Sequence, residues 1–180
     1  MNAFENIVKL YLEEEGYWVR QSVKVNISKE DKEYIGKFSM PTPEVDLVAL
    51  KVRENELLLV EAKSFLDSPG VRFFGISGQD PKDAKRYKLF TNSKLREVVT
   101  RQLRREYLNG GLIKDDTKIS YGLAAGHIHA GDEPKIAEYF SKNGWKLFTP
   151  KMIKEKVKAL SRRGWEDDLV TMTAKLILKK

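Results

Sequence analysis

Two stretches decide the fold of this chain, Glu44-Val45-Asp46-Leu47-Val48-Ala49-Leu50 and Val60-Glu61-Ala62-Lys63. Apart from their charged residues both are strongly apolar, which is typical of strands in the interior of a sheet. Between them, Arg53-Glu54-Asn55 has the polar composition of a turn. We therefore predict a β-hairpin with strands at 45–52 and 56–63.

Three charged side chains interrupt these apolar strands, at Asp46, Glu61 and Lys63. Side chains alternate between the two faces of a strand, so Glu61 and Lys63 point to the same face. If the chain turns between Arg53 and Glu54, Asp46 lies opposite Glu61. A register shifted by two residues would place Asp46 opposite Lys63 instead. In either case these charges need a partner, because an unpaired charge is costly in an apolar setting.

A divalent cation would explain two facing carboxylates in this hairpin. Opposed side chains on neighbouring strands lie about 5 Å apart at Cβ, where two negative charges repel each other. Two carboxylates, completed by water and a substrate phosphate, suit Mg²⁺ better than Ca²⁺. The ammonium of Lys63 could then hold or deprotonate an attacking water and stabilise the transition state. The alternative for each residue alone is an ordinary ion pair near the end of the strand.

Outward from the hairpin, the hydrophobic pattern predicts a mixture of helices and strands. We expect helices at 4–12, 94–108, 134–142 and 150–160, and strands at 17–27, 34–39, 119–125 and 145–148. Gly16 and Gly144 should end helices, and Thr149 should cap one. The charged residues 28–33 are expected to form a turn. The residues after Gly164 are expected to form a helix, with 176–178 as an alternative edge strand.

This order of elements predicts an α/β fold with a central mixed sheet flanked by helices, as one domain over residues 1–180. Charged residues make up 33% of the chain and the net charge is +7, which favours an acidic partner such as nucleic acid over a membrane. The absence of cysteine excludes disulfides, zinc–thiolate sites and iron–sulfur clusters. The N-terminal residues do not resemble a signal peptide, so we expect a cytoplasmic protein.

Two basic regions are candidates for nucleic-acid binding. One is the polar side of the helix at 94–108, with Arg96, Arg101, Arg104 and Arg105. The other contains Lys82, Lys85 and Arg86. The alternative for the helix is a merely solvated face, because glutamates alternate with its arginines.

The hairpin residues resemble the PD-(D/E)XK nuclease superfamily, which includes type II restriction enzymes and archaeal Holliday junction resolvases. The matching elements are Asp46 and the triplet Glu61-Ala62-Lys63, within about the first third of the chain; Val45 stands where the family carries proline. The resemblance implies a restriction-endonuclease-like core. It also implies DNA cleavage with Mg²⁺, or Mn²⁺ as a substitute, held by Asp46, Glu61 and the Ala62 carbonyl, to leave a 5′-phosphate.

Two further residues enter the site through this resemblance. The first helix is similar to that of the archaeal resolvases, which implies that Glu5 positions the metal or its water; a surface pair with Lys9 explains Glu5 equally well. Gln102 lies on the apolar side of its helix, from which a glutamine reaches the active site in several related nucleases. A structural role for Gln102 is equally compatible with the sequence. Together with the abundance of Lys, Arg and Glu, the resemblance favours an archaeal, thermophilic source.

The sequence therefore predicts a Mg²⁺-dependent endonuclease that hydrolyses DNA, with structured or branched DNA as one candidate substrate. Nucleases that cut both strands often act as homodimers, so a homodimer is one expected assembly. The first alternative is a catalytically inactive nucleic-acid-binding module with the nuclease fold. The second is a protein-interaction domain whose carboxylates form surface salt bridges.

Overall fold

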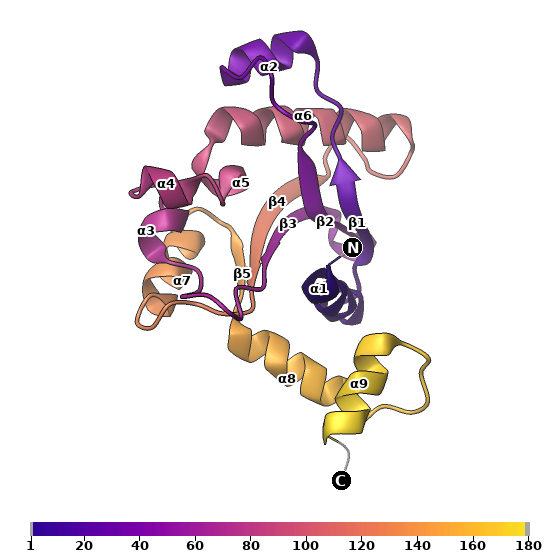
Figure 1. Cartoon of the computed structure of the whole chain (residues 1–180). Helices are drawn as coiled ribbons and strands as arrows, with labels where there is room; N and C mark the ends of the chain where they lie inside the picture. Colours follow the sequence, from indigo (N-terminus) through magenta and orange to yellow (C-terminus); the bar gives the residue numbers. More distant parts are fainter. Residues whose placement is uncertain (1, 179–180) are drawn as a thin grey trace.

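A five-stranded mixed sheet forms the centre of the molecule in the computed structural model, which describes residues 2–178 (Figure 1). Its strands, in spatial as well as chain order, are β1 (Trp18–Lys24), β2 (Glu44–Lys51), β3 (Glu56–Lys63), β4 (Lys118–Ala125) and β5 (Lys146–Phe148). The first three are antiparallel, and β4 and β5 run parallel to β3. The predicted α/β fold with a mixed sheet is confirmed.

Helices cover both faces of this sheet. They are α1 (Ala3–Glu14), α2 (Lys29–Ile35), α3 (Phe73–Ile76), α4 (Pro81–Ala84), α5 (Lys88–Thr91), α6 (Ser93–Asn109), α7 (Glu133–Lys142), α8 (Pro150–Leu160) and α9 (Leu169–Leu178). Helices α1 and α8 lie on one side, and α6, α7 and the short helices α3 to α5 lie on the other (Figure 1). Among the described residues, no helix has the length and apolar character to cross a bilayer.

The side chains of β3 build the core on both faces of the sheet. Leu58 and Val60 pack with Leu47 in the apolar cluster beneath α1, whereas Leu57 and Leu59 belong to the cluster beneath α6. All four leucine and valine side chains of β3 are fully buried. The strand is therefore continuously apolar because each face lies under a helical layer.

The hairpin has the predicted register. Leu47 is the partner of Val60, so the pairing continues toward Asp46 and Glu61 and not toward Asp46 and Lys63. The turn consists of a short 3₁₀ segment, η1 (Val52–Glu54), followed by a residue in the left-handed conformation, Asn55. Asparagine tolerates that conformation better than most residues do.

Several predicted helix ends are also confirmed. Gly16 follows α1 with φ +85°, and Gly144 follows α7 with φ +67°, both in the left-handed region that favours glycine. The Thr149 hydroxyl accepts a hydrogen bond from the Met152 amide at the start of α8. At the C-terminal end, residues 176–178 belong to helix α9, not to an edge strand.

The prediction for residues 25–39 was wrong. Strand β1 ends at Lys24, and helix α2 occupies part of the segment expected to hold a turn and a second strand. The reason is local: Ser28 and Asp31 form a capping box, in which each side chain accepts a hydrogen bond from the backbone amide of the other. Gly36, with φ +77°, then ends the helix.

Candidate active site

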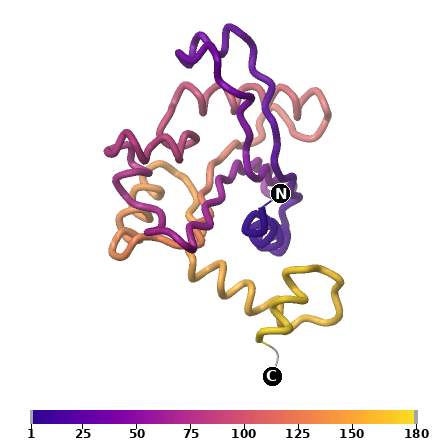
Figure 2. Tube along the Cα trace, in the orientation of Figure 1, coloured from indigo at the N-terminus to yellow at the C-terminus, as the bar shows by residue number. Residues whose placement is uncertain are grey.

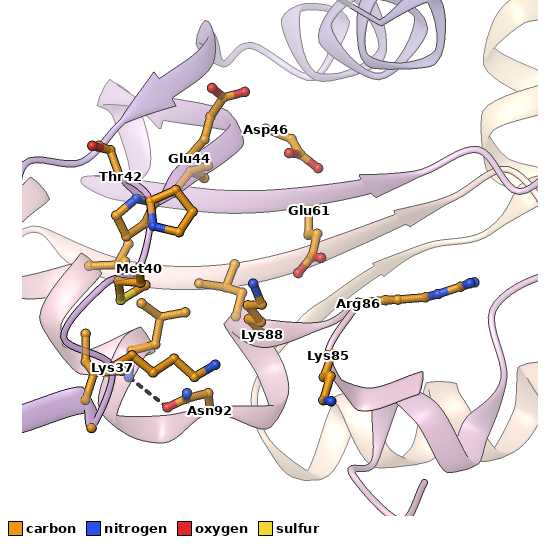
Figure 3. A pocket seen from close by; sticks show the side chains of 18 of the residues that line it. Lys37, Met40, Thr42, Glu44, Asp46, Glu61, Lys85, Arg86, Lys88 and Asn92 are labelled. Atoms are coloured by element: carbon orange, nitrogen blue, oxygen red, sulfur yellow. Dashed lines mark hydrogen bonds between the residues drawn. The ribbon is translucent and has the colours of Figure 1, made fainter. Parts of the chain in front are cut away.

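The three predicted residues meet at one end of the sheet, where β2 begins and β3 ends. The β2–β3 pairing stops at Leu47 and Val60. Beyond this pair, the β3 backbone is hydrogen-bonded to the Asp46 side chain and not to the β2 backbone. Asp46 Oδ2 accepts a hydrogen bond of 2.8 Å from the Ala62 amide. Figure 3 shows Asp46 and Glu61 on neighbouring strands, with the Glu61 carboxylate directed toward the side of the cleft that carries Lys88.

The carbonyl of Ala62 completes a set of oxygen donors at this position. The N–H and C=O of one residue in a strand point to the same neighbouring strand. The Ala62 amide points toward Asp46, so its carbonyl also points to the β2 edge, where the backbone pairing has ended. Two carboxylates and one carbonyl are hard oxygen ligands of the kind that Mg²⁺ prefers.

Lys63 forms an ion pair within this group. Its Nζ lies 2.8 Å from Glu61 Oε1, and the two side chains are only 22% and 14% exposed. Burial raises the pKa of the Glu61 carboxyl, and the nearby charge of Lys63 only partly offsets that effect. Burial lowers the pKa of the Lys63 ammonium, but the charges of Glu61, Asp46 and Glu5 outweigh it and the net pKa is raised. Lys63 is therefore a cation at neutral pH.

Asp46, like Glu61, is harder to ionise than a carboxyl group in water. Burial raises the pKa of Asp46, and neither the hydrogen bond from Ala62 nor the charge of Lys63 reverses this. Both carboxylates thus resist ionisation. An additional cation between them would lower their pKa values and remove the repulsion.

Glu5 lies close enough to this group to interact with it electrostatically. It stands in the first turn of α1, and its pKa is raised by burial and then by the charge of Asp46. Lys9, the alternative surface partner for Glu5, pairs with Glu13 at 3.7 Å. The tertiary structure thus places Glu5 near the group at the start of β2.

A cleft of about 1000 Å³ opens over the carboxylates. One wall is the segment 36–43 between α2 and β2, and the other contains residues of the segment 85–92 around α5. The charged residues that line it are Lys37, Glu44, Asp46, Glu61, Lys63, Lys85, Arg86 and Lys88. Lys37 and Lys88 extend into it from its two walls (Figure 3). The acids lie at the strand ends, and most of the cations lie on the walls.

Only part of the second basic region predicted from the sequence lies at this cleft. Lys85 and Arg86 line it, and the Arg86 guanidinium also lies 5.7 Å from the centre of the Phe65 ring. Lys82 is exposed on α4 and is not among the residues that line the cleft.

Gln102 is placed elsewhere in the structure. Its side-chain amide donates a hydrogen bond of 2.7 Å to the carboxylate of Asp31 on α2. Arg101 donates to the other oxygen of the same carboxylate at 2.5 Å, and Arg105 is exposed on the next part of α6. Gln102 and Arg101 therefore connect α6 to α2, and neither extends the carboxylate group.

Arg96 and Arg104 have structural partners as well. Arg96 donates to the carbonyl oxygens of Leu89 and Phe90 at 3.1 and 3.0 Å. Arg104 donates to the carbonyl of Thr117 at 2.9 Å. The four arginines of α6 do not line the cleft, so their role in binding nucleic acid stays a prediction.

Sequence reasoning missed the wall that carries Lys37 and Phe38. The segment was assigned to a strand, although two local signals for a helix were present. Ser28 and Asp31 have the spacing of a capping box, and Gly36 is suited to a helix end. These signals place Lys37 and Phe38 in the connection between α2 and β2.

Within residues 2–178, no three histidine, cysteine, aspartate or glutamate side chains come together as a ready-made metal-binding group. A cation here would need the Ala62 carbonyl, water or substrate oxygens in addition to Asp46 and Glu61. Comparison of the chain with family models, with curated proteins and with solved structures finds no match.

Proposed function

We propose that this protein is a Mg²⁺-dependent nuclease of the restriction-endonuclease-like type that hydrolyses DNA phosphodiester bonds. The observation that supports it most directly is the grouping of Asp46, Glu61 and Lys63 at the base of a cleft with basic walls. The resemblance of these residues to the PD-(D/E)XK elements points the same way.

The donor set fits a hard divalent cation. Asp46, Glu61 and the Ala62 carbonyl would hold it, and a bound cation would offset the cost of ionising these two buried carboxyl groups. A bound Mg²⁺ would supply Lewis-acid polarisation of the phosphate and a lowered pKa for its water. The site offers two carboxylates. This number suits Mg²⁺, which is usually held by one or two carboxylates while water and substrate oxygens complete its coordination.

Lys63 acts as a hydrogen-bond donor in this proposal. In the metal-free protein, burial lowers the pKa of Lys63, but the charge of Glu61 outweighs burial and raises it overall, so the side chain is protonated at neutral pH. As an ammonium, it would orient the attacking water and stabilise the negative charge that develops on the phosphate oxygens. The sequence offers a second role, in which Lys63 deprotonates that water.

The wall cations supply the affinity for the substrate. Lys37, Lys85 and Lys88 are exposed side chains that line the cleft. Exposed ammonium groups bind phosphates mainly through charge, and this binding weakens as salt concentration rises. They would hold the DNA backbone over the carboxylates, which themselves repel phosphate.

The proposal is tested by incubating labelled single-stranded, duplex and branched DNA with the protein at increasing Mg²⁺ or Mn²⁺. We expect cleavage that requires the metal and stops in EDTA, with 5′-phosphate products. DNA binding without cleavage at any metal concentration would favour the inactive binding module. Failure to bind DNA at all would favour the protein-interaction domain.

Replacing Asp46 with asparagine should raise the melting temperature of the metal-free protein at pH 8. The folded-state pKa of Asp46 is raised, so its ionised form costs stability above that pKa, and a neutral side chain of the same shape removes the cost. Because wild-type Asp46 also becomes neutral on acidification, the difference should shrink toward pH 4. Differential scanning calorimetry in EDTA measures both effects.

The same variant should lose the stabilisation that Mg²⁺ gives to the wild type. Binding to the folded state alone contributes about 2.7 kcal/mol at a ligand concentration one hundred times Kd. We expect Mg²⁺ to raise the melting temperature of the wild type and to change that of Asp46→Asn much less. A wild-type melting temperature that does not respond to Mg²⁺ would contradict the metal site.

A further inference from the structure

The cleft has room for a short stretch of nucleic acid. Its volume is about 1000 Å³, a size that encloses a drug-sized ligand, comparable with about two or three nucleotides. In a duplex the bases are stacked on one another, so a side chain can stack on a base face only after that base has been unstacked. An aromatic side chain in the cleft therefore favours an unpaired strand.

The wall formed by residues 36–43 carries an exposed aromatic side chain. Phe38 lines the cleft and is 74% exposed, with the cation Lys37 before it in the chain and Met40 shortly after it. The ring is therefore available to a ligand in the cleft. Exposed aromatics beside cations are the usual means by which proteins bind unpaired bases, through stacking on the ring and attraction of the phosphates.

Helix α2 directly precedes this wall in the chain (Figure 2) and is joined to α6 by hydrogen bonds. Asp31 of α2 is buried and accepts hydrogen bonds from Arg101 and Gln102 of α6. Tyr34, one turn further on, donates a hydrogen bond of 2.8 Å to Glu97 of the same helix. These contacts fix the segment that presents Phe38 before any ligand binds, which reduces the entropic cost of binding.

We propose that the cleft binds an unpaired DNA strand, with a base stacked on Phe38 and the flanking phosphates near Lys37 and Lys88. This inference rests on the proposed function and specifies its substrate as single-stranded DNA or the single-stranded part of a branched molecule. The stacked base holds the strand so that the next phosphates pass over Asp46 and Glu61. Gln102 and Asp31 act as positioning residues for this wall.

The test measures binding apart from cleavage. Fluorescence anisotropy in EDTA gives the affinities of the full-length protein for a labelled 15-nucleotide single strand and for the blunt duplex of the same sequence. The variants are Phe38→Ala, Phe38→Tyr, which keeps an aromatic ring, and Phe74→Ala. Phe74 is a matched control because it is also an exposed phenylalanine, at 56%, but it does not line the cleft.

We expect the wild type to bind the single strand more tightly than the duplex. Phe38→Ala should weaken single-strand binding about 5-fold to 100-fold, because stacking on one aromatic ring contributes that range. Phe38→Tyr and Phe74→Ala should bind the single strand as the wild type does. Circular dichroism melting of each variant shows that an affinity loss does not come from unfolding.

Equal binding of single strand and blunt duplex by the wild type would overturn the proposal, as would unchanged binding by Phe38→Ala. The outcome is separable from that of the proposed function. Phe38-dependent binding of the single strand without metal-dependent cleavage would support this inference and reject the nuclease. Cleavage of blunt duplex that is insensitive to Phe38→Ala would support the nuclease and reject this inference.

Discussion

Replacing Lys63 with alanine should reduce DNA cleavage by about 10²-fold to 10³-fold or more, the loss typical of removing one charged donor that acts in the transition state. The effect should be large because Lys63 is the only cation within 4 Å of the Glu61 carboxylate in the described part of the chain, at 2.8 Å. DNA binding should stay within a few-fold of the wild type, because Lys37, Lys85 and Lys88 on the walls are unchanged. Single-turnover cleavage and anisotropy in EDTA measure the two quantities.

Two control variants separate this role from general charge. Lys63→Arg keeps a positive charge and should retain part of the activity. Lys88→Ala removes an exposed cation of the same cleft and should weaken binding while leaving the rate at saturating DNA nearly unchanged. Full activity of Lys63→Ala would contradict the assigned role of this lysine.

Replacing Lys146 with methionine should lower the free energy of unfolding by about 2–3 kcal/mol, within the usual cost of removing one partner of a buried charged pair. Glu56 at the start of β3 is only 4% exposed. Its carboxylate accepts hydrogen bonds from Lys146 at 2.5 Å, from Tyr17 at 2.9 Å and from Ser120 at 2.7 Å. Without Lys146, a buried negative charge would lose its counterion. The loss should be smaller than for a fully buried ion pair, because the Lys146 side chain is 38% exposed and water weakens its attraction to Glu56.

Urea denaturation at pH 7 measures this change. The matched control is Lys142→Met, since Lys142 pairs with Glu138 on the surface, where both side chains are more than half exposed, and its loss should have a small effect. Burial raises the pKa of Glu56, but its hydrogen bonds, chiefly from Lys146, outweigh burial and lower the pKa overall. The ionised Glu56 carboxylate therefore stabilises the folded state at pH values above its pKa in the unfolded chain. This stabilisation is lost as the pH falls through the lower pKa that Glu56 has in the folded protein. The gap between wild type and Lys146→Met should close at acid pH, and a constant gap would contradict the ion pair as its cause.

This pair lies at the end of the sheet away from the cleft, at the start of β3 and β5. Lys146→Met should therefore change stability without changing the rate of DNA cleavage measured well below its melting temperature. Conversely, Asp46→Asn should change cleavage and slightly increase stability. The two ends of β3 thus have separate functions, one in folding and one in the proposed chemistry.

The sequence by itself determined the hairpin, its register and the grouping of Asp46, Glu61 and Lys63. These follow from short-range rules: side chains alternate along a strand, the turn length sets the register, and apolar runs mark buried strands. The helix ends at Gly16 and Gly144 could be predicted for the same reason, since each depends on the backbone conformation of one residue. Helix α2 depends on equally local signals, the capping box of Ser28 and Asp31 at its start and Gly36 at its end.

Only the tertiary structure decided which partners the long polar side chains would have. Gln102 and Arg101 could face a site, solvent or another element, and the packing of α2 on α6 directs both to Asp31. Glu5 approaches Asp46 because α1 packs on the face of the sheet over β2 and β3, which no spacing within α1 reveals. A flexible side chain gains its partner from whichever element packs nearby, so its role depends on contacts between residues far apart in the chain. The hairpin could therefore be predicted from local pattern, whereas the cleft around it, with Phe38 on its wall, could not.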